Sequence, residues 1–305
     1  MAVRRPSARA YVGRMPINEI PLTAGASGGS TVTIPQLGFG VFQVDDADVD
    51  AALATAFETG YRHVDTARIY QNEDGTGRAI AATDVPREDL FITTKLWNDA
   101  QGAEATRAAF EESLQRLGLE TLDLYLIHWP TPAAGLIAET WQAMRELRDA
   151  GRVRAIGVCN FRVADLQEVY DATGEWPSIN QVELHPYLQQ TELRAFHDEH
   201  GIVTEAWSPI GQGGDLLQDE TIAGIAEKHG VTPAQVVIAW HLAVGNVVIP
   251  KSVTPSRIAE NFASTEVPLD EDDLAAIAGL DKPDDSGRIG PDPGEMNAGA
   301  VGVDA

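Results

Sequence analysis

The sequence predicts an α/β protein whose fold is a (β/α)8 barrel, the TIM-barrel architecture, with an N-terminal β-hairpin and two extra helices. The first observation is that a short strand-like segment followed by a helix-like segment recurs along most of the 305 residues. The second is that the strand-like segments are mostly apolar, as parallel strands covered on both faces should be. The third is the number of units, since eight close a barrel whereas open doubly wound sheets usually have fewer strands.

The hairpin is expected over residues 18–36, where short apolar and β-branched pieces flank a Gly/Ser-rich turn at 25–30. The barrel strands are expected over residues 37–40, 62–65, 90–95, 122–128, 153–158, 178–182, 202–206 and 247–249. The helices after them are expected over residues 46–59, 75–82, 103–117, 137–150, 163–173, 190–199, 219–229 and 255–263. Two further helices, at 232–244 and 270–280, fall outside the repeat.

The barrel is expected to form a single domain over residues 15–305, because no linker-like stretch divides the chain. Residues 1–14 are basic but lack the apolar segment of a secretory signal, so they are predicted to be a mobile N-terminal tail. Translation could start at Met1 or at Met15. Residues 281–305, rich in Asp, Pro and Gly, are predicted to be an irregular C-terminal tail.

Composition excludes several classes of partner. The net charge of −24 would repel a polyphosphate, so no nucleic-acid partner is expected. No apolar run reaches the ~18 residues of a membrane span, so no membrane partner is expected. The one cysteine, Cys159, excludes an internal disulfide and a Cys-rich zinc module. We expect a cytoplasmic protein, a monomer, that acts on a small molecule.

The lysines are informative because they are rare. The 22 basic residues include only four lysines, at positions 95, 228, 251 and 282. Where arginine serves for most positive charges, a retained lysine can mark a place that needs a compact ammonium with a shiftable pKa. Lys228 and Lys282 lie in surface-like segments, whereas Lys95 and Lys251 end apolar strands. The latter two are therefore candidates for a functional site.

The active site of such a barrel lies at the carboxyl ends of its strands. Those ends carry Asp65, Lys95, His128, Cys159, Asn160, Gln181, Glu183, Trp207, Ser208, Lys251 and Ser252, and the loop after Asp65 carries Tyr70. Each of the central four has a structural explanation of its own: Asp65 could cap a turn, Tyr70 could pack, Lys95 could form a surface ion pair, and His128 could be a core histidine. Their convergence on one barrel mouth favours a functional site.

This set of residues suits proton donation to a carbonyl oxygen. A free tyrosine has a pKa of about 10, too high for an efficient acid at neutral pH, and a nearby ammonium lowers it. Lys95 can supply that charge to Tyr70, Asp65 can hold Lys95, and His128 can orient the substrate oxygen. The set contains no nucleophile with a dedicated base, which argues against triad-type hydrolysis. A hydride donor would have to be a cofactor.

The second half of the chain offers places to bind such a cofactor. Residues 207–211 place an aromatic ring before a polar loop, and residues 249–254, followed by Arg257, collect two cations and two hydroxyls before a helix N-terminus. Positive charge and a helix dipole together favour an anion. No GxGxxG follows a strand, so a Rossmann site is not implied. A solvated surface pair is the alternative for Lys251 and Arg257.

The stretches GYRHVDTA, TTKLW, LIHWP, IGVCNF, NQVELHPY, AWSPIG and IPKSVTPSRIAEN resemble signature segments of the aldo-keto reductases, in order and spacing, over residues 18–295. The detailed pattern is similar to the bacterial 2,5-diketogluconate reductase branch. The resemblance implies NADPH-dependent reduction of aldehydes or ketones. It implies Tyr70 as general acid, Lys95 and Asp65 as its supporting pair and His128 as the orienting histidine.

The resemblance also implies the binding residues. Cofactor contacts would come from Cys159, Asn160, Gln181, Trp207, Ser208, Ile210, Gly211, Lys251, Ser252, Val253, Thr254, Arg257, Glu260 and Asn261. The substrate pocket would be lined by Phe39, Val41, Trp97, Trp129 and the C-terminal tail. Cys159 stands where the family usually has a serine, which puts one hydrogen bond to the cofactor in doubt because a thiol is a weak donor.

Two alternatives stay open on the sequence. One is a barrel that binds NADPH but serves as a redox sensor or structural protein, which would not need all four residues of the catalytic set. The other is a metal-dependent hydrolase, because His63 and Asp65 share a face of one strand. No set of strand-end histidines completes a ligand sphere for the second alternative.

Overall fold

The computed structural model describes residues 17–23 and 31–302. Eight parallel strands lie in the order β10-β9-β8-β7-β6-β5-β4-β3. They are β3 (Gly38–Gly40), β4 (His63–Asp65), β5 (Phe91–Leu96), β6 (Leu122–Ile127), β7 (Val153–Cys159), β8 (Ile179–Glu183), β9 (Val203–Trp207) and β10 (Val247–Val248). The backbone N–H of Val248 donates to Gln36 at 2.9 Å, and Leu37 forms a parallel bridge with Val248, so the ends of the sheet meet. The expected TIM barrel is confirmed.

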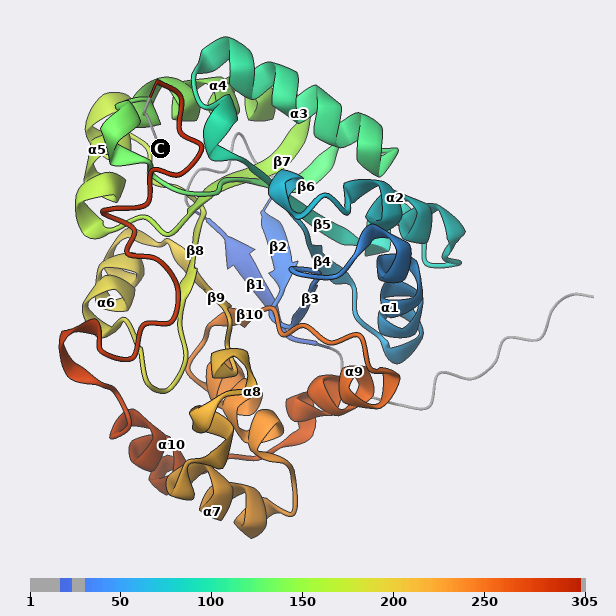
Figure 1. The fold of residues 1–305 in the computed structure, drawn as a ribbon, viewed down its shortest axis with the longest axis vertical. Helices are drawn as coiled ribbons and strands as arrows, with labels where there is room; N and C mark the ends of the chain where they lie inside the picture. The colour runs from blue at the N-terminus through green and yellow to red at the C-terminus, as the bar shows by residue number, and fades with distance from the viewer. Residues whose placement is uncertain (1–16, 24–30, 303–305) are drawn as a thin grey trace, which may run out of the picture.

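The helices surround these strands (Figure 1). They are α1 (Asp46–Thr59), α2 (Glu73–Ala82), α3 (Ala103–Leu117), α4 (Ile137–Asp149), α5 (Val163–Thr173), α6 (Thr191–His200), α7 (Glu220–His229), α8 (Pro233–Ala243), α9 (Pro255–Phe262) and α10 (Glu271–Ala278). The two helices predicted outside the repeat are α8 and α10. The C-caps of α3, α5, α6 and α7 are glycines in the left-handed region, which ends each helix without the steric penalty of a Cβ atom.

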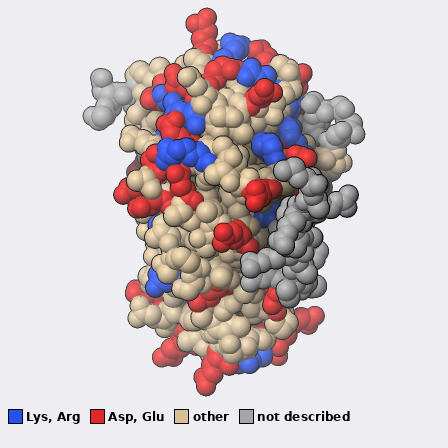
Figure 2. All heavy atoms as spheres, turned by 90° about the vertical axis from the view of Figure 1, so that its right-hand side faces the viewer, with Lys and Arg blue, Asp and Glu red and all other residues tan. Residues whose placement is uncertain are grey.

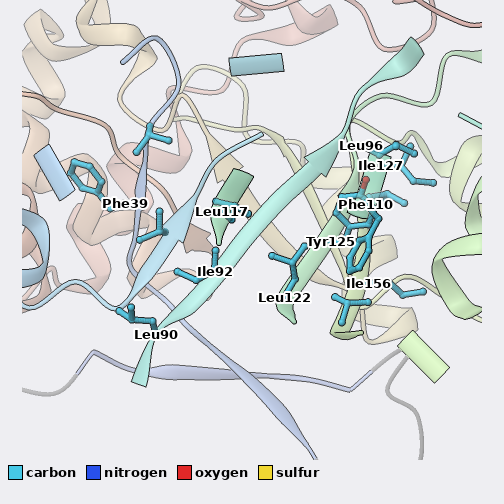
Figure 3. Close-up of a cluster of buried hydrophobic side chains, with 14 of the residues drawn as sticks. Phe39, Leu90, Ile92, Leu96, Phe110, Leu117, Leu122, Tyr125, Ile127 and Ile156 are labelled. Atoms are coloured by element: carbon cyan, nitrogen blue, oxygen red, sulfur yellow. The ribbon is translucent and has the colours of Figure 1, made fainter. Parts of the chain in front are cut away.

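The main core fills the space between the strands and the helices. Along β6, Leu124 and Leu126 belong to the cluster inside the barrel, while Tyr125 and Ile127 belong to the cluster outside it. This is the alternation that a strand imposes on successive side chains. Figure 3 shows Phe110 of α3 lying against Tyr125, and their ring centroids are 5.0 Å apart in an edge-to-face arrangement.

The hairpin closes the amino-terminal end of the barrel. Strands β1 (Glu19–Leu22) and β2 (Val32–Pro35) pair in antiparallel fashion, as predicted. Leu22 and Ile34 pack in the same buried cluster as Ile179 and Val247, which begin barrel strands. The amino-terminal end of the barrel is therefore covered. The tail predicted over 1–14 and the turn predicted over 25–30 lie outside the described residues.

The C-terminal tail is largely irregular, as predicted, and it crosses the carboxyl ends of the strands. The backbone N–H groups of Ile289 and Gly290 donate to the Glu183 carboxylate at 2.6 and 2.8 Å. The side chain of Asn98 donates to the Ala298 carbonyl at 2.9 Å. A Cβ at Gly290 would lie 2.5 Å from the Trp207 ring, so this close approach requires glycine. The tail thus forms part of the mouth of the barrel.

Candidate active site

A cleft of about 900 Å³ opens at the carboxyl ends of the barrel strands, where the sequence predicts the site. Its lining is Gly40, Phe42, Gln43, Asp65, Ile69, Tyr70, Trp97, His128, Trp129, Asn160, Gln181, Trp207, Ser208, Pro209, Ile210, Gln212, Gly213, Leu217, Thr232, Pro233, Ala234, Ile249, Lys251, Ser252, Val253, Thr254, Arg257, Glu260, Asn261, Gly290, Pro291 and Met296. The volume is of the size that binding clefts for organic ligands have, roughly 300–1,000 Å³.

Three of the predicted catalytic side chains meet at the floor of this cleft. Asp65 ends β4, Lys95 lies near the end of β5, and Tyr70 is carried by a short 3-10 helix, Arg68–Tyr70. The Lys95 ammonium donates to Asp65 Oδ1 at 2.5 Å, to the Thr66 carbonyl at 2.9 Å and to the Tyr70 hydroxyl at 3.4 Å. Lys95 itself is completely buried, so it acts from beneath Tyr70.

Burial and charge compete at this floor. Burial lowers the pKa of Lys95, but Asp65 and Tyr70 outweigh that effect, so the pKa lies above its ordinary value and Lys95 stays an ammonium. Burial raises the pKa of Tyr70 to about 12, and Lys95 opposes that rise. The predicted direction of the lysine's effect is therefore correct, but burial is stronger and the net pKa is raised. Tyr70 keeps its proton at neutral pH.

His128 adjoins this group from the end of β6. Its ring lies 5.7 Å from the Tyr70 ring, measured between centroids, and 5.2 Å from the Trp97 ring. Burial, with a smaller contribution from Lys95, holds the pKa of His128 well below its usual value, so the imidazole is neutral. A neutral imidazole can donate a hydrogen bond to a ligand oxygen without carrying charge.

Asn160, Gln181 and Trp207 form the next wall of the cleft. Asn160 has φ of 61°, a left-handed conformation that asparagine tolerates better than most residues. Its side-chain nitrogen donates to the His128 carbonyl at 3.0 Å, and its oxygen accepts from Trp207 Nε1 at 2.8 Å. The Gln181 nitrogen donates to Asp65 Oδ2 at 2.9 Å. The wall and the catalytic floor are thus one hydrogen-bonded unit.

The cations of the cleft lie at its other end. Lys251 and Arg257 line it around the N-terminus of α9, and neither has an ion-pair partner among the described residues. The Ser252 hydroxyl accepts from the backbone N–H of Thr254 at 3.1 Å. Glu260 accepts from the Thr232 hydroxyl at 2.9 Å. Two cations without carboxylate partners beside a helix N-terminus suit a phosphate.

The structure does not bring every predicted site residue to the cleft. Phe39 and Val41, predicted for the substrate pocket, are buried in the core, where the Phe39 ring packs on Tyr61 at 5.3 Å. Their neighbours Gly40, which ends β3, and Phe42, in the turn after it, line the cleft instead. The expectation for Phe39 and Val41 is therefore corrected.

Two predicted cofactor contacts also lie off the lining. Cys159 is buried, and its environment raises the pKa of the thiol well above the ordinary value, chiefly through burial. Gly211 is buried next to the lining residue Ile210. The remaining predicted contacts all line the cleft: Asn160, Gln181, Trp207, Ser208, Ile210, Lys251, Ser252, Val253, Thr254, Arg257, Glu260 and Asn261.

Sequence reasoning missed residues of two kinds. The resemblance places the tail at the substrate pocket but not its individual residues, of which Pro291 and Met296 line the cleft; Ile69 lines it from the 3-10 helix Arg68–Tyr70. Glu205 is completely buried within β9 and interacts with Gln181, whose nitrogen donates to Glu205 Oε2 at 3.0 Å. An acidic residue at the centre of a buried strand is a signal that could have identified Glu205.

The described residues also bear on the alternatives. They contain no group of three or more His, Cys, Asp or Glu side chains arranged to hold a metal ion. His63 instead contacts the Thr93 hydroxyl at 3.2 Å inside the barrel. Nor does any helix in the described part of the chain have the length and apolar character needed to cross a bilayer.

Comparison with known proteins agrees with this geometry. The family model described as aldo/keto reductase matches residues 35–282. An aldo-keto reductase of Mycolicibacterium smegmatis is 54% identical over 265 residues, which are 87% of this chain and 95% of that protein. Methylglyoxal reductase DkgA of Salmonella typhimurium is 53% identical over 264 residues, 86% and 94% of the two chains.

Solved structures give the same result. The crystal structure of a Gox0644 variant in complex with NADPH matches with a TM-score of 0.82 and 50% identity. That match covers 86% of this chain and 94% of the Gox0644 chain. An aldo/keto reductase from Brucella melitensis matches with a TM-score of 0.83, 49% identity and coverage of 88% and 100%. The chain therefore belongs to the aldo/keto reductase family of oxidoreductases.

Proposed function

We propose that this protein reduces small aldehydes or ketones to alcohols with NADPH, and that Tyr70 is the general acid. The observation that carries the proposal is the contact of one buried ammonium, Lys95 Nζ, with both Asp65 and the Tyr70 hydroxyl at the floor of the cleft. Such an arrangement has no use in a protein that only binds a dinucleotide, because binding does not require a stabilised phenolate.

The residues of the cleft suit NADPH. Lys251 and Arg257 supply positive charge without competing carboxylate partners among the described residues, which suits the 2′-phosphate. Trp207 lies beside Asn160 and offers a ring face, and Asn160 and Gln181 carry amides suited to a carboxamide. When bound, the cofactor supplies the hydride that none of the protein's side chains can provide.

The protein's own groups handle the proton and the orientation of the substrate. Neutral His128 hydrogen-bonds the carbonyl oxygen and directs it toward Tyr70. Tyr70 gives its proton to that oxygen as the alkoxide forms. The phenolate left behind lies 3.4 Å from the Lys95 ammonium, which stabilises it most when its charge is largest. Asp65 keeps Lys95 charged and in place.

The relatives support a small substrate. A protein 53% identical to this chain is named methylglyoxal reductase, and the cleft near Tyr70 is narrowed by the aromatic residues Phe42, Trp97 and Trp129. A compact carbonyl compound with little charge would fit between these rings. The cytoplasmic location and monomeric state expected from the sequence remain predictions.

Replacing Tyr70 with phenylalanine tests the proposal. NADPH oxidation with methylglyoxal should fall at least about 100-fold, because a positioned general acid contributes roughly 10²–10⁴-fold. NADPH binding, followed by tryptophan fluorescence, should stay within a factor of about two, because the ring remains in place. Tyr170→Phe on α5 is the matched control and should keep full activity, since Tyr170 is partly exposed and does not line the cleft. Near-parental turnover by Tyr70→Phe would refute the assignment.

A further inference from the structure

The carboxyl group of Glu205 is buried in the barrel, and the proposed mechanism gives it no role. Glu205 lies in β9 directly opposite Gln181 in the register of β8, and its side chain has no exposure to solvent. It does not line the cleft but lies beneath it, behind Gln181. Burying a carboxyl group inside a barrel is costly, so its contacts are informative.

Those contacts fix the orientation of one side-chain amide. The Gln181 nitrogen donates to Asp65 Oδ2 at 2.9 Å and to Glu205 Oε2 at 3.0 Å. A primary amide has two N–H bonds, and both are therefore directed at carboxyl groups in the barrel interior. The atom that Gln181 has left for a ligand in the cleft is its amide oxygen. With Asp65 as the sole acceptor, the amide could rotate and offer nitrogen or oxygen.

The groups around Glu205 come from four neighbouring strands. Asp65 and His63 face it from β4, Lys95 from β5, Cys159 from β7 and Gln181 from β8. The nearest oxygen of Glu205 lies 3.8 Å from His63 Nε2, and burial lowers the pKa of His63 to about 3, so this histidine brings no positive charge. Burial and Asp65 raise the pKa of Glu205 to about 8. A protonated carboxyl group still accepts a hydrogen bond from Gln181.

We propose that Glu205 is a positioning residue of the hydride-transfer site, which acts by holding the Gln181 amide so that its oxygen faces the cleft. The inference rests on the proposed function, because the Gln181 oxygen would accept a hydrogen bond from the carboxamide N–H of the nicotinamide. Glu205 touches neither cofactor nor substrate. Its effect passes through Gln181, while Asp65 holds the other N–H.

Three substitutions distinguish a role in positioning the Gln181 amide from a role that only fills volume in the core. Glu205→Gln keeps a neutral acceptor of the same length and should bind NADPH within a factor of about two of the parent. Glu205→Leu keeps the volume but removes the acceptor, and should weaken NADPH binding about five- to tenfold, as the loss of one hydrogen bond does. Glu205→Asp shortens the side chain, so the carboxyl group moves away from Gln181, and this variant should also weaken NADPH binding. Binding is measured by tryptophan quenching, with thermal unfolding recorded for each variant.

The pattern among these variants decides the outcome. Recovery by glutamine together with loss in leucine and aspartate supports the inference, because a purely structural role would not distinguish glutamine from leucine by cofactor affinity. Equal losses in glutamine and leucine, or unchanged affinity in leucine and aspartate, would overturn it. If leucine does not fold, the aspartate variant still decides. Failure of the proposed function looks different: the parent would bind NADPH yet reduce no carbonyl compound.

Discussion

At the scale of single residues, Lys95 contacts two groups with different needs, the Asp65 carboxylate and the Tyr70 hydroxyl. Its ammonium lies between Asp65 and Tyr70 with no solvent exposure, so it pairs with a buried carboxylate and, under the proposed function, would stabilise the phenolate of Tyr70. In the resting protein, burial dominates and the pKa of Tyr70 is raised to about 12. If Tyr70 is the general acid, as proposed, Lys95 contributes most once Tyr70 has lost its proton, which is the condition for stabilising a transition state.

The two roles of Lys95 can be separated by a double substitution. Lys95→Met should leave Asp65 as an unpaired buried charge and lower the free energy of unfolding by about 3–5 kcal/mol. Adding Asp65→Asn removes that charge and should restore most of the stability. NADPH oxidation should stay reduced at least about 100-fold in both variants, because the phenolate still lacks its cation. Urea denaturation and steady-state kinetics measure the two effects.

The control for the lysine substitution is Lys282→Met, on the tail, where the ammonium lies 3.8 Å from the Tyr187 ring centroid and away from the cleft. It should leave turnover unchanged. A double variant that regained both stability and turnover would show that Lys95 acts only by pairing with Asp65.

At the scale of elements, local pattern was sufficient for the strands and helices but not for the tail. The predicted bounds of α3 and α5 are those observed, because a glycine follows the last helical residue in each case. The tail is positioned by hydrogen bonds from Ile289 and Gly290 to Glu183, across 106 and 107 residues of sequence. The resemblance placed the tail at the substrate pocket, but no local propensity encodes a contact at that separation, so Pro291 and Met296 could not be identified within it.

The same distinction applies to the site. Asp65, Lys95 and His128 could be predicted together because the barrel brings the carboxyl ends of its strands to one mouth. Phe39 and Val41 were assigned wrongly because the resemblance gives positions in the chain, whereas the direction of a side chain depends on the register of β3. Burial of Tyr70 depends on packing of distant elements, so the sign of its net pKa shift could not be predicted.

The extra helix α10 supplies an element-scale prediction about pH. Asp273 accepts from Lys228 at 2.7 Å, from His229 at 2.7 Å and from the Asp270 backbone at 3.1 Å, which joins α10 to α7. Although burial acts in the opposite direction, these bonds lower the pKa of Asp273 to about 2. A lowered carboxyl pKa stabilises the fold above the unfolded pKa of about 4 and ceases to do so as pH falls toward 2.

Asp273→Asn should therefore lower the free energy of unfolding at pH 7 by about 1–3 kcal/mol, since it weakens hydrogen bonds to charged partners. The difference in free energy of unfolding between variant and parent should shrink between pH 4 and pH 3, because the parent's Asp273 then contributes less stability. Urea denaturation at several pH values measures it. Asp272→Asn, an exposed neighbour that removes the same formal charge, should show little deficit at any pH. A deficit independent of pH would contradict the assignment.

At the scale of the whole molecule, the charge distribution bears on the choice of substrate. The chain carries a net charge of −24, and Figure 2 shows acidic side chains spread over the face it presents. Among the described residues that line the cleft, Lys251 is the only lysine and Arg257 the only arginine. Around Tyr70 and His128 the cleft is instead lined by the aromatic rings of Phe42, Trp97 and Trp129, while the Lys95 ammonium lies below the lining and is paired with Asp65. An anionic substrate would thus approach a like-charged molecule and find aromatic surface at its destination.

This arrangement predicts a preference for uncharged carbonyl compounds. Methyl 4-formylbenzoate and 4-formylbenzoate share the reacting aldehyde and the ring and differ chiefly in charge. The ester should have a kcat/KM at least about tenfold higher, because a carboxylate that loses water without gaining a partner costs more than 1.4 kcal/mol. Salt screens long-range repulsion but not this local cost, so the difference should persist at 0.5 M NaCl. Met296→Lys, which adds a cation to the lining, should reduce the difference in kcat/KM between the two aldehydes. Equal kcat/KM values for the two aldehydes in the parent would contradict this prediction.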